Sequence, residues 1–174
     1  GGGGCAWGAW GSYCDLREVE SDRLWAATSQ PTGARPDQYT VVFSEERATF
    51  SRQDDDIHTT LEVVVSTEDD AEVRRLTIAN NGSRSREIEV TSYADIALAQ
   101  QAADIAHPAF AKMFVQTEYP AGSGAILATL RRRSPDDAEL GAAQHPGAAG
   151  EGRGNVESRR DRNGSRRGGR AGRG

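Results

Sequence analysis

Carboxylates are the most abundant side chains in this sequence that could do chemistry, with 26 Asp and Glu among 174 residues. They are densest in two runs, Asp54–Asp56 and Glu68–Asp70. A pair of carboxylates that flanks a glycosidic bond could act as general acid and base. Both runs, however, interrupt strand-like segments, where Asp is favoured because its side chain bonds to nearby backbone. We therefore expect solvated turns at both places, with a catalytic or metal site as the alternative.

Other catalytic and metal-binding patterns are missing from the sequence. The three histidines, His58, His107 and His145, are far apart in the chain. Only two cysteines are present, Cys5 and Cys14, which is too few for a disulfide framework and makes a zinc site improbable. No Gly-x-Ser-x-Gly elbow, phosphate loop or dinucleotide fingerprint occurs. We predict two free thiols, no metal and no cofactor.

Aromatic residues are concentrated in the first 25 positions, as Trp7, Trp10, Tyr13 and Trp25. An aromatic face can stack on the apolar side of a sugar ring, which makes these four residues candidate carbohydrate contacts. The alternative is that they fill one end of a β-sandwich core.

The segment HPAFAKMF, residues 107–114, supplies three more candidate carbohydrate contacts, His107, Phe110 and Lys112. It belongs to an Ala-rich stretch in which Pro108 limits any helix, so we predict a long loop. Loops on a rigid sheet often carry binding residues. A purely structural loop is the alternative.

The stretch from Ile57 to Leu98 contains three strand-like runs around which the rest of the chain is organised. Apolar and polar residues alternate at period two from Ile57 and again from Ile88, as on strands with one buried and one solvated face. Between the second and third runs, residues 80–83 (Asn-Asn-Gly-Ser) tolerate the positive φ of a tight hairpin turn. We therefore expect an antiparallel meander.

Shorter segments on both sides of this stretch have the alternation or the β-branched and aromatic content of further strands. They are residues 12–19, 24–27, 39–43, 47–52, 113–119 and 125–132. About seven strands then precede residue 98, which favours an all-β fold with an antiparallel β-sandwich.

Charge and glycine are distributed unevenly along the chain. Residues 141–174 contain eight Arg, three acidic residues and ten of the 20 Gly, whereas the first 140 residues carry 13 basic and 23 acidic groups. We predict three parts: a flexible Gly-rich start at residues 1–11, a partial β-sandwich domain at 12–140, and a disordered Arg/Gly-rich tail at 141–174. The acidic body does not favour nucleic acid, because attraction to phosphate needs clustered Lys and Arg.

No apolar run approaches the roughly 20 residues of a membrane helix, and the first residues lack the order of a signal peptide. We therefore expect a cytoplasmic chain without a membrane segment. One function open to such a chain is a standalone interaction module whose Arg/Gly tail binds RNA or an acidic partner, although no aromatic residue is interleaved in that tail.

Several consecutive blocks of the sequence resemble one family. They are WGSYCDLREVESDRLWAATSQPTG, PDQYTVVFSEERATFSR, TTLEVVVSTEDDAEVRRLTIANNGSRSREIEVTSYADIAL, HPAFAKMFVQTEY and ILATLRRRSPDD, in that order between residues 10 and 140. Together they resemble the β-sandwich segment of glycoside hydrolase family 94, once classed as glycosyltransferase family 36, which includes cyclic β-1,2-glucan synthases and β-glucan phosphorylases.

The resemblance implies a super-sandwich that packs against an (α/α)6 barrel, where the family's catalytic Asp and most of its glucan and phosphate contacts lie. It also implies carbohydrate binding, packing between domains and dimer contacts for the sandwich itself. The implied partners are therefore a β-glucan oligosaccharide, the catalytic barrel of a parent protein, and a second copy of the chain. A parent synthase would be associated with the inner membrane.

This sequence departs from the family pattern in three places, one of which is a shorter segment between the opening glycines and the WGSY block. No helical barrel is present, so no catalytic residue is transferred and we expect the chain alone to be inactive. After His145 the family's sandwich continues with more strands, whereas this chain becomes Arg/Gly-rich, so we expect an incomplete sandwich from a partial or frame-disrupted chain. Strands left without neighbours would expose apolar faces and reduce solubility.

Overall fold

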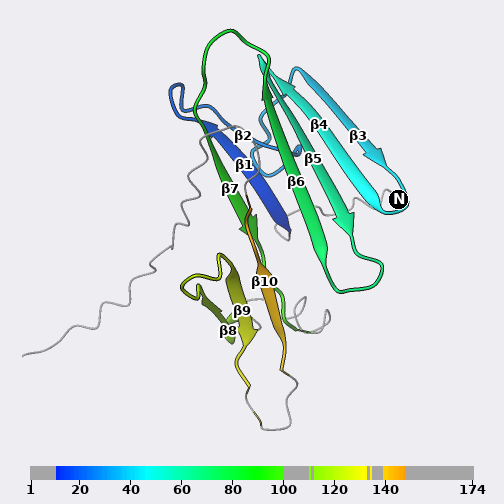
Figure 1. Ribbon diagram of the computed structural model, residues 1–174, viewed down its shortest axis with the longest axis vertical. Coiled ribbons are helices and arrows are strands. Elements are labelled where there is room, and N and C mark those ends of the chain that lie inside the picture. The colour runs from blue at the N-terminus through cyan, green and yellow to red at the C-terminus, as the bar shows by residue number, and fades with distance from the viewer. Residues whose placement is uncertain (1–10, 100–109, 111, 133, 135–138, 148–174) are drawn as a thin grey trace, which may run out of the picture. The chain divides into compact units, whose positions relative to one another are not determined.

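The computed structural model describes residues 11–99, 110, 112–132, 134 and 139–147 (Figure 1). The chain forms two compact units, Gly1–Asp95 and Ile96–Gly174. The regular structure of the described residues consists of ten strands in three antiparallel sheets, which confirms the all-β prediction. Residues 1–10 of the predicted flexible start, and the predicted tail beyond residue 147, lie outside the described residues.

The larger sheet of the first unit has four strands in the order β3-β4-β5-β6. These are β3 (Gln38–Phe43), β4 (Arg47–Asp54), β5 (Ile57–Val65) and β6 (Glu72–Asn80). Each strand pairs with the next strand in the chain through a short turn, as the alternating pattern predicts. One row across the sheet joins Phe50, Leu61 and Leu76, so apolar residues from three strands share the face that is buried.

The second sheet of this unit has three strands in the order β2-β1-β7. These are β1 (Ser12–Glu18), β2 (Leu24–Ala26) and β7 (Ile88–Ala94). Strand β1 lies in the middle because it pairs with β2 on one side and with the whole length of β7 on the other. The seven strands before residue 98 agree with the number expected from the sequence.

The core lies between these two sheets and makes the first unit a sandwich. Leu16 and Trp25 come from the three-stranded sheet, and Ile57 and Leu61 come from the four-stranded sheet. Leu16 has no exposed surface, and burial of one such aliphatic side chain stabilises a fold by roughly 1.5–3 kcal/mol. Half-buried apolar side chains surround this centre: Ala34, Phe50, Val63, Leu76, Ile78 and Ile88.

The predicted meander was wrong for its third strand. Strand β7 does not pair with β6; it belongs to the other sheet and pairs with β1. The Asn80–Ser83 segment opens a longer connection, in which Asn80 Nδ2 donates to the Arg84 carbonyl at 2.7 Å. A tight hairpin fails here because Arg84 and Arg86 are drawn to Glu18 at the end of β1, which carries the chain across to the second sheet.

The second unit contains one small sheet with the strand order β10-β9-β8. Its strands are β8 (Val115–Glu118), β9 (Ile126–Leu130) and β10 (Gly141–Gln144). The first two fall inside predicted segments, but the prediction of no ordered strand beyond residue 140 was wrong for β10. Gly-Ala-Ala-Gln has little intrinsic strand preference, so this segment becomes a strand through its pairing with β9, as in Ala143 opposite Leu127.

Candidate functional site

Two tyrosines stack across strands on the outer face of the three-stranded sheet, the face directed away from the core. Tyr13 alternates with buried Cys14 on β1 and therefore points outward, and its register partner on β7 is Tyr93. Their ring centroids lie 5.7 Å apart with 15° between the planes. Because β7 is an edge strand, Tyr93 keeps 51% of its surface exposed. The pair thus offers an aromatic surface at the sheet edge.

Asp15 is the next residue along β1 on the same outer face as Tyr13. Its register partners are Ala26 on β2 and Thr91 on β7. Asp15 Oδ1 is buried and has no hydrogen-bond partner among the described residues, and burial raises the pKa of this carboxyl. A buried acceptor without a partner costs free energy, roughly 1–3 kcal/mol.

Arg17 continues the outer face one step further along β1. Its guanidinium donates to Glu89 Oε2 from Nε at 2.9 Å and from Nη2 at 2.6 Å, and to Asp22 Oδ1 at 3.0 Å. The hydrogen bonds that Arg17 donates to Glu89 and then to Asp22 raise the pKa of its guanidinium. This exposed group holds charged donors and acceptors beside Asp15.

The outer face therefore combines an aromatic pair, a carboxylate with spare hydrogen-bonding capacity and an Arg–Glu pair on three successive outward positions of β1. Aromatic rings bind apolar faces, and carboxylate and guanidinium groups bind hydroxyls. This combination suits a ligand with one apolar and one hydroxyl-bearing side. No redox or metal chemistry is needed for it.

Trp25, a predicted sugar contact, lies in the core with 2% of its surface exposed. Its ring packs with Leu16 and its register places it on the inner side of β2. The Arg23 guanidinium lies 6.0 Å from the ring centroid. In this conformation the Trp25 ring presents no open face to a ligand.

The remaining candidates are distributed between the two units. Tyr13 is on the outer face described above. Phe110, in the second unit, is 53% exposed and packs edge to face on Phe114 at 5.1 Å between centroids, and Lys112 is half-buried in the same segment. The other three, Trp7, Trp10 and His107, lie outside the described residues. A sugar contact by any of these candidates stays a prediction.

Sequence reasoning missed Tyr93 and Asp15 as members of this face. The alternation of β7 does place Tyr93 on the same side as Thr91 and Glu89. What the sequence cannot supply is the pairing of β1 with β7, which joins positions about 80 residues apart and sets Tyr93 beside Tyr13.

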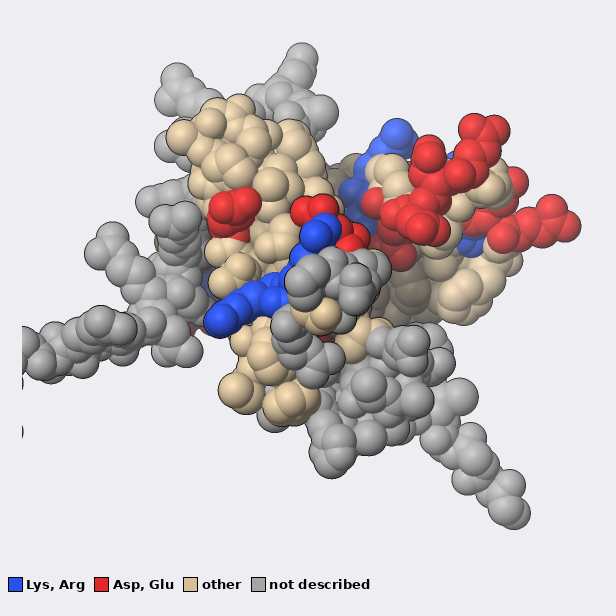
Figure 2. Space-filling view, turned by 90° about the horizontal axis from the view of Figure 1, so that it is seen from below, with Lys and Arg blue, Asp and Glu red and all other residues tan. Residues whose placement is uncertain are grey.

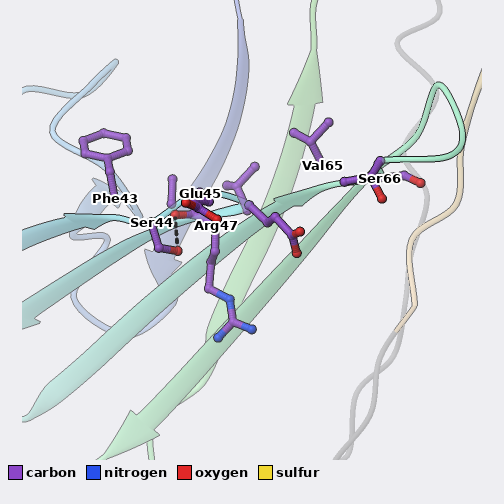
Figure 3. Close-up of a pocket in the computed structure, with 10 residues that line it drawn as sticks. Phe43, Ser44, Glu45, Arg47, Val65 and Ser66 are labelled. Atoms are coloured by element: carbon purple, nitrogen blue, oxygen red, sulfur yellow. Dashed lines mark hydrogen bonds between the residues drawn. The ribbon is translucent and has the colours of Figure 1, made fainter.

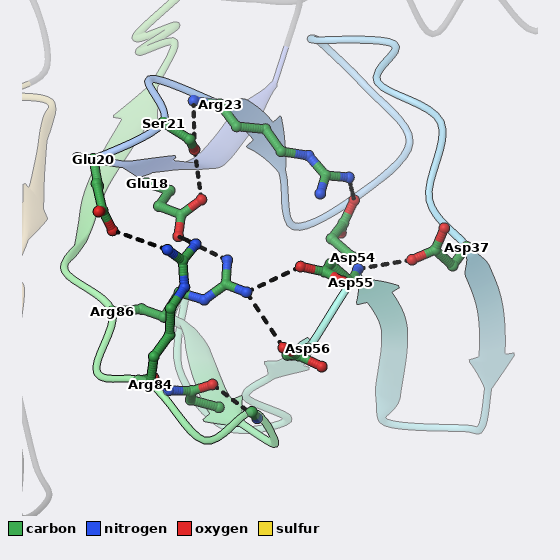
Figure 4. Close-up of polar contacts among 12 residues, drawn as sticks. Glu18, Glu20, Ser21, Arg23, Asp37, Asp54, Asp55, Asp56, Arg84 and Arg86 are labelled. Atoms are coloured by element: carbon green, nitrogen blue, oxygen red, sulfur yellow. Dashed lines mark hydrogen bonds and ion pairs between the residues drawn. The ribbon is translucent and has the colours of Figure 1, made fainter.

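One end of the sandwich is closed by a charged cluster centred on Arg86 (Figure 4). Arg86 Nη1 donates to Glu18 Oε1 at 2.7 Å, and its Nη2 donates to Asp55 Oδ2 at 2.9 Å and Asp56 Oδ2 at 3.4 Å. Ser21 donates to Glu18 at 2.5 Å. The Ser21 hydrogen bond and then Arg86 lower the pKa of Glu18, and Arg86 lowers the pKa of Asp55.

A second ion pair lies inside the sandwich at the same end. Arg52 and Asp54 are almost completely buried, with Nε to Oδ2 at 2.5 Å and Nη2 to Oδ1 at 2.9 Å. Arg52 also donates to the carbonyls of Thr28 at 3.2 Å and Ala34 at 2.9 Å, so it anchors the segment between β2 and β3. Asp54 is therefore not part of a solvated turn as predicted; the turn contains Asp55 and Asp56 only.

Cys14 is a free, buried thiol, in agreement with the prediction for that residue. Burial raises the pKa of the thiol, which makes it a weak nucleophile. No group of three or more His, Cys, Asp or Glu that could hold a metal ion occurs within the described part of the chain.

Comparison with known proteins agrees with this fold. A family model of the glycosyl hydrolase 94 supersandwich domain matches residues 5–163. The chain belongs to this family. It is also 37% identical over 130 residues to cyclic beta-(1,2)-glucan synthase NdvB of Rhizobium meliloti (strain 1021).

The match to that synthase covers 75% of this supersandwich chain but 5% of the relative. The chain is therefore similar to one small part of a much longer protein. Within the residues that the structure describes, no helix is long and apolar enough to cross a membrane.

Proposed function

We propose that this supersandwich chain is a non-catalytic carbohydrate-binding and scaffolding domain of a β-glucan synthase or β-glucan phosphorylase. The outer face of the three-stranded sheet is the proposed sugar surface. The observation that supports this best is the stacked Tyr13–Tyr93 pair, with an exposed Tyr93 ring, beside the half-buried carboxylate of Asp15. A pyranose ring would place its apolar side on Tyr93 and a hydroxyl on Asp15.

The proposal assigns no bond cleavage to this face. Glycoside hydrolysis needs two carboxylates on opposite sides of the scissile bond. Among the described residues, the carboxylates grouped around Arg17 beside Asp15 are Glu89 and Asp22, and both accept hydrogen bonds from Arg17. Binding and positioning of a glucan are what this arrangement can do, while the chemistry belongs to another part of the parent protein.

The proposed ligand is a β-1,2-linked gluco-oligosaccharide, since the matched relative is a cyclic β-(1,2)-glucan synthase. The proposed macromolecular partner is the (α/α)6 catalytic barrel of the parent protein. A homodimer is a further proposal that the family resemblance supports.

The test is a titration of the chain with β-1,2-gluco-oligosaccharides by isothermal calorimetry. Tyr93→Ala should weaken binding about tenfold, because it removes the exposed ring, a loss on the order of 1 kcal/mol or slightly more. Tyr119→Ala is the matched control, since Tyr119 is a half-exposed tyrosine of the second unit. Asp15→Ala should also weaken binding.

Equal affinity of the Tyr93→Ala and wild-type proteins would overturn this assignment of the face. No binding to the wild-type protein would overturn the carbohydrate function. A salt-sensitive shift with RNA and none with glucan would instead support the interaction module that binds through its Arg/Gly tail.

A further inference from the structure

The four-stranded sheet extends beyond the part that the three-stranded sheet covers. Along the inner face of β5, Leu61 is 4% exposed, Val63 is half-buried and Val65 is 56% exposed. On β3 the inner face ends at Phe43, which is 73% exposed although its ring packs edge to face on Phe50 at 6.2 Å. The core thus continues outward as an apolar surface without a cover among the described residues.

A hollow of about 370 Å³ lies at this end of the sheet (Figure 3). We name it the hairpin groove because the β3–β4 and β5–β6 turns border it. Its apolar lining consists of Phe43, Ala48 and Val63, which form one row across β3, β4 and β5, together with Val65. The remaining lining residues are polar: Ser44, Glu45, Glu46, Arg47, Ser66 and Thr67. An apolar floor with a polar rim is typical of a site for an inserted side chain.

The rim of the hairpin groove is acidic. Figure 2 shows acidic side chains gathered in one part of the surface, and this end contributes Glu45, Glu46 and Glu68–Asp70, all exposed. The nearby cations are already paired: Arg47 and Arg75 with Glu62 at 3.0 and 3.7 Å, and Arg74 with Glu72. Glu45 and Glu46 line the groove, and Glu68–Asp70 follow its lining residue Thr67 in the chain. None of these five carboxylates has an ion-pair partner within the described residues, so this end of the sheet attracts cations.

We infer that the hairpin groove docks a cationic amphipathic segment of a partner protein, with an apolar side chain over Ala48 and Val63 and with Lys or Arg against the rim. Charge selects this occupant. A second copy docked groove to groove would bring a like-charged rim to the contact, its Arg/Gly-rich segment offers charge but few large apolar side chains, and nucleic acid would bring phosphates. The groove belongs to the four-stranded sheet and is independent of the proposed sugar surface on the other sheet.

The experiment is a titration of the full chain, ¹⁵N-labelled, with a synthetic helical peptide that has Leu on one face and Lys on the other. Amide shifts should be confined to residues 43–48 and 63–67. Phe43→Ser should weaken binding at least about tenfold, as expected for loss of a central apolar contact. Val42→Ser is the matched control, because Val42 is 56% exposed and points to the opposite face of the same strand.

Charge is tested with the double variant Glu45→Lys/Glu46→Lys against Glu87→Lys/Glu118→Lys, which makes the same charge change at exposed positions elsewhere. The Glu45→Lys/Glu46→Lys variant should bind the peptide severalfold more weakly than the wild-type protein, and the control variant should bind it almost equally well. This difference in affinity should shrink as the salt concentration rises from about 0.05 to about 0.5 M. Equal binding by the Phe43→Ser and wild-type proteins, or equal binding of a Leu/Glu peptide, would overturn the inference. So would a concentration-dependent dimer in sedimentation that Phe43→Ser dissolves, because the occupant would then be a second copy.

Discussion

The two ends of the four-stranded sheet use similar residue types in opposite ways. At the β4–β5 turn, Asp54, Asp55 and Asp56 each meet an Arg, and the end is closed by paired charge (Figure 4). At the hairpin groove, Glu45 and Glu46 have no such partner among the described residues, and Phe43 remains exposed (Figure 3). The difference shows that the position of the arginines decides which acidic turns stabilise the fold and which remain available for binding.

The largest expected effect comes from the closed end. Asp54→Ala removes the partner of Arg52, which is fully buried and would keep an uncompensated charge. The free energy of unfolding should fall by about 3–5 kcal/mol, measured by urea denaturation. Glu45→Ala at the open end is the matched control and should change it by less than about 0.5 kcal/mol. Similar losses for both variants would remove the contrast between the two ends.

A smaller effect is expected from the connection that carries the chain between the two sheets. A Cβ at Gly82 would lie 2.5 Å from Asp56 Oδ2, while the Asn81 amide donates to the Asp56 carbonyl at 2.8 Å. Gly82→Ala must displace the Asp56 side chain from Arg86. We expect the free energy of unfolding, measured by thermal denaturation, to fall by about 1–2 kcal/mol. Gly147→Ala meets nothing within 4 Å and should be neutral, so equal melting temperatures for both variants would contradict the close approach.

The pH dependence of stability should also originate at the closed end. Hydrogen bonds from Ser21 and Arg86 lower the folded-state pKa of Glu18, and Arg86 lowers that of Asp55. Their stabilisation is fully present above the unfolded pKa values, about 4.3 and 3.9, and is lost as pH falls through the lower folded values. Asp15 affects stability in the opposite direction. Burial raises the pKa of its carboxyl, so its contribution to folding stability declines as pH rises.

Arg86→Gln should therefore destabilise the chain near neutral pH, and the difference from the wild-type protein should diminish on acidification from about pH 6 to about pH 3. Arg132→Gln is the control, since Arg132 pairs with the exposed Glu139 at 2.7 Å. A pH-independent difference for Arg86→Gln would show that the Glu18 and Asp55 charges do not couple to folding.

Much of the local structure follows from the sequence. The alternation from Ile57 to Val65 predicts β5 with Ile57, Thr59 and Leu61 on the buried face, as observed. The aromatic and β-branched run at residues 39–43 predicts β3. Prediction from sequence fails for β10 because its residue pattern is weak. It fails for Asp54 because contacts with residues elsewhere in the fold decide whether this side chain is buried.

The candidate site was only partly predictable for the same reason. Tyr13 was identified from its residue type, but its partner Tyr93 and the neighbouring Asp15 depend on the register between β1 and β7. The hairpin groove could not be predicted, because the residue pattern of β3 and β5 does not show how far the three-stranded sheet covers them, and the structure leaves Phe43 and Val65 exposed.

The sequence by itself determined the family and, apart from β10, the strands, because period-two alternation and a long run of shared residues are local properties of the chain. Tertiary structure decided the path from β6 to β7, the stacking of Tyr13 on Tyr93, and which carboxylates are paired. Those features depend on contacts between residues distant in the chain, where Arg86 reaches Glu18 and the shorter sheet leaves the end of the longer one uncovered.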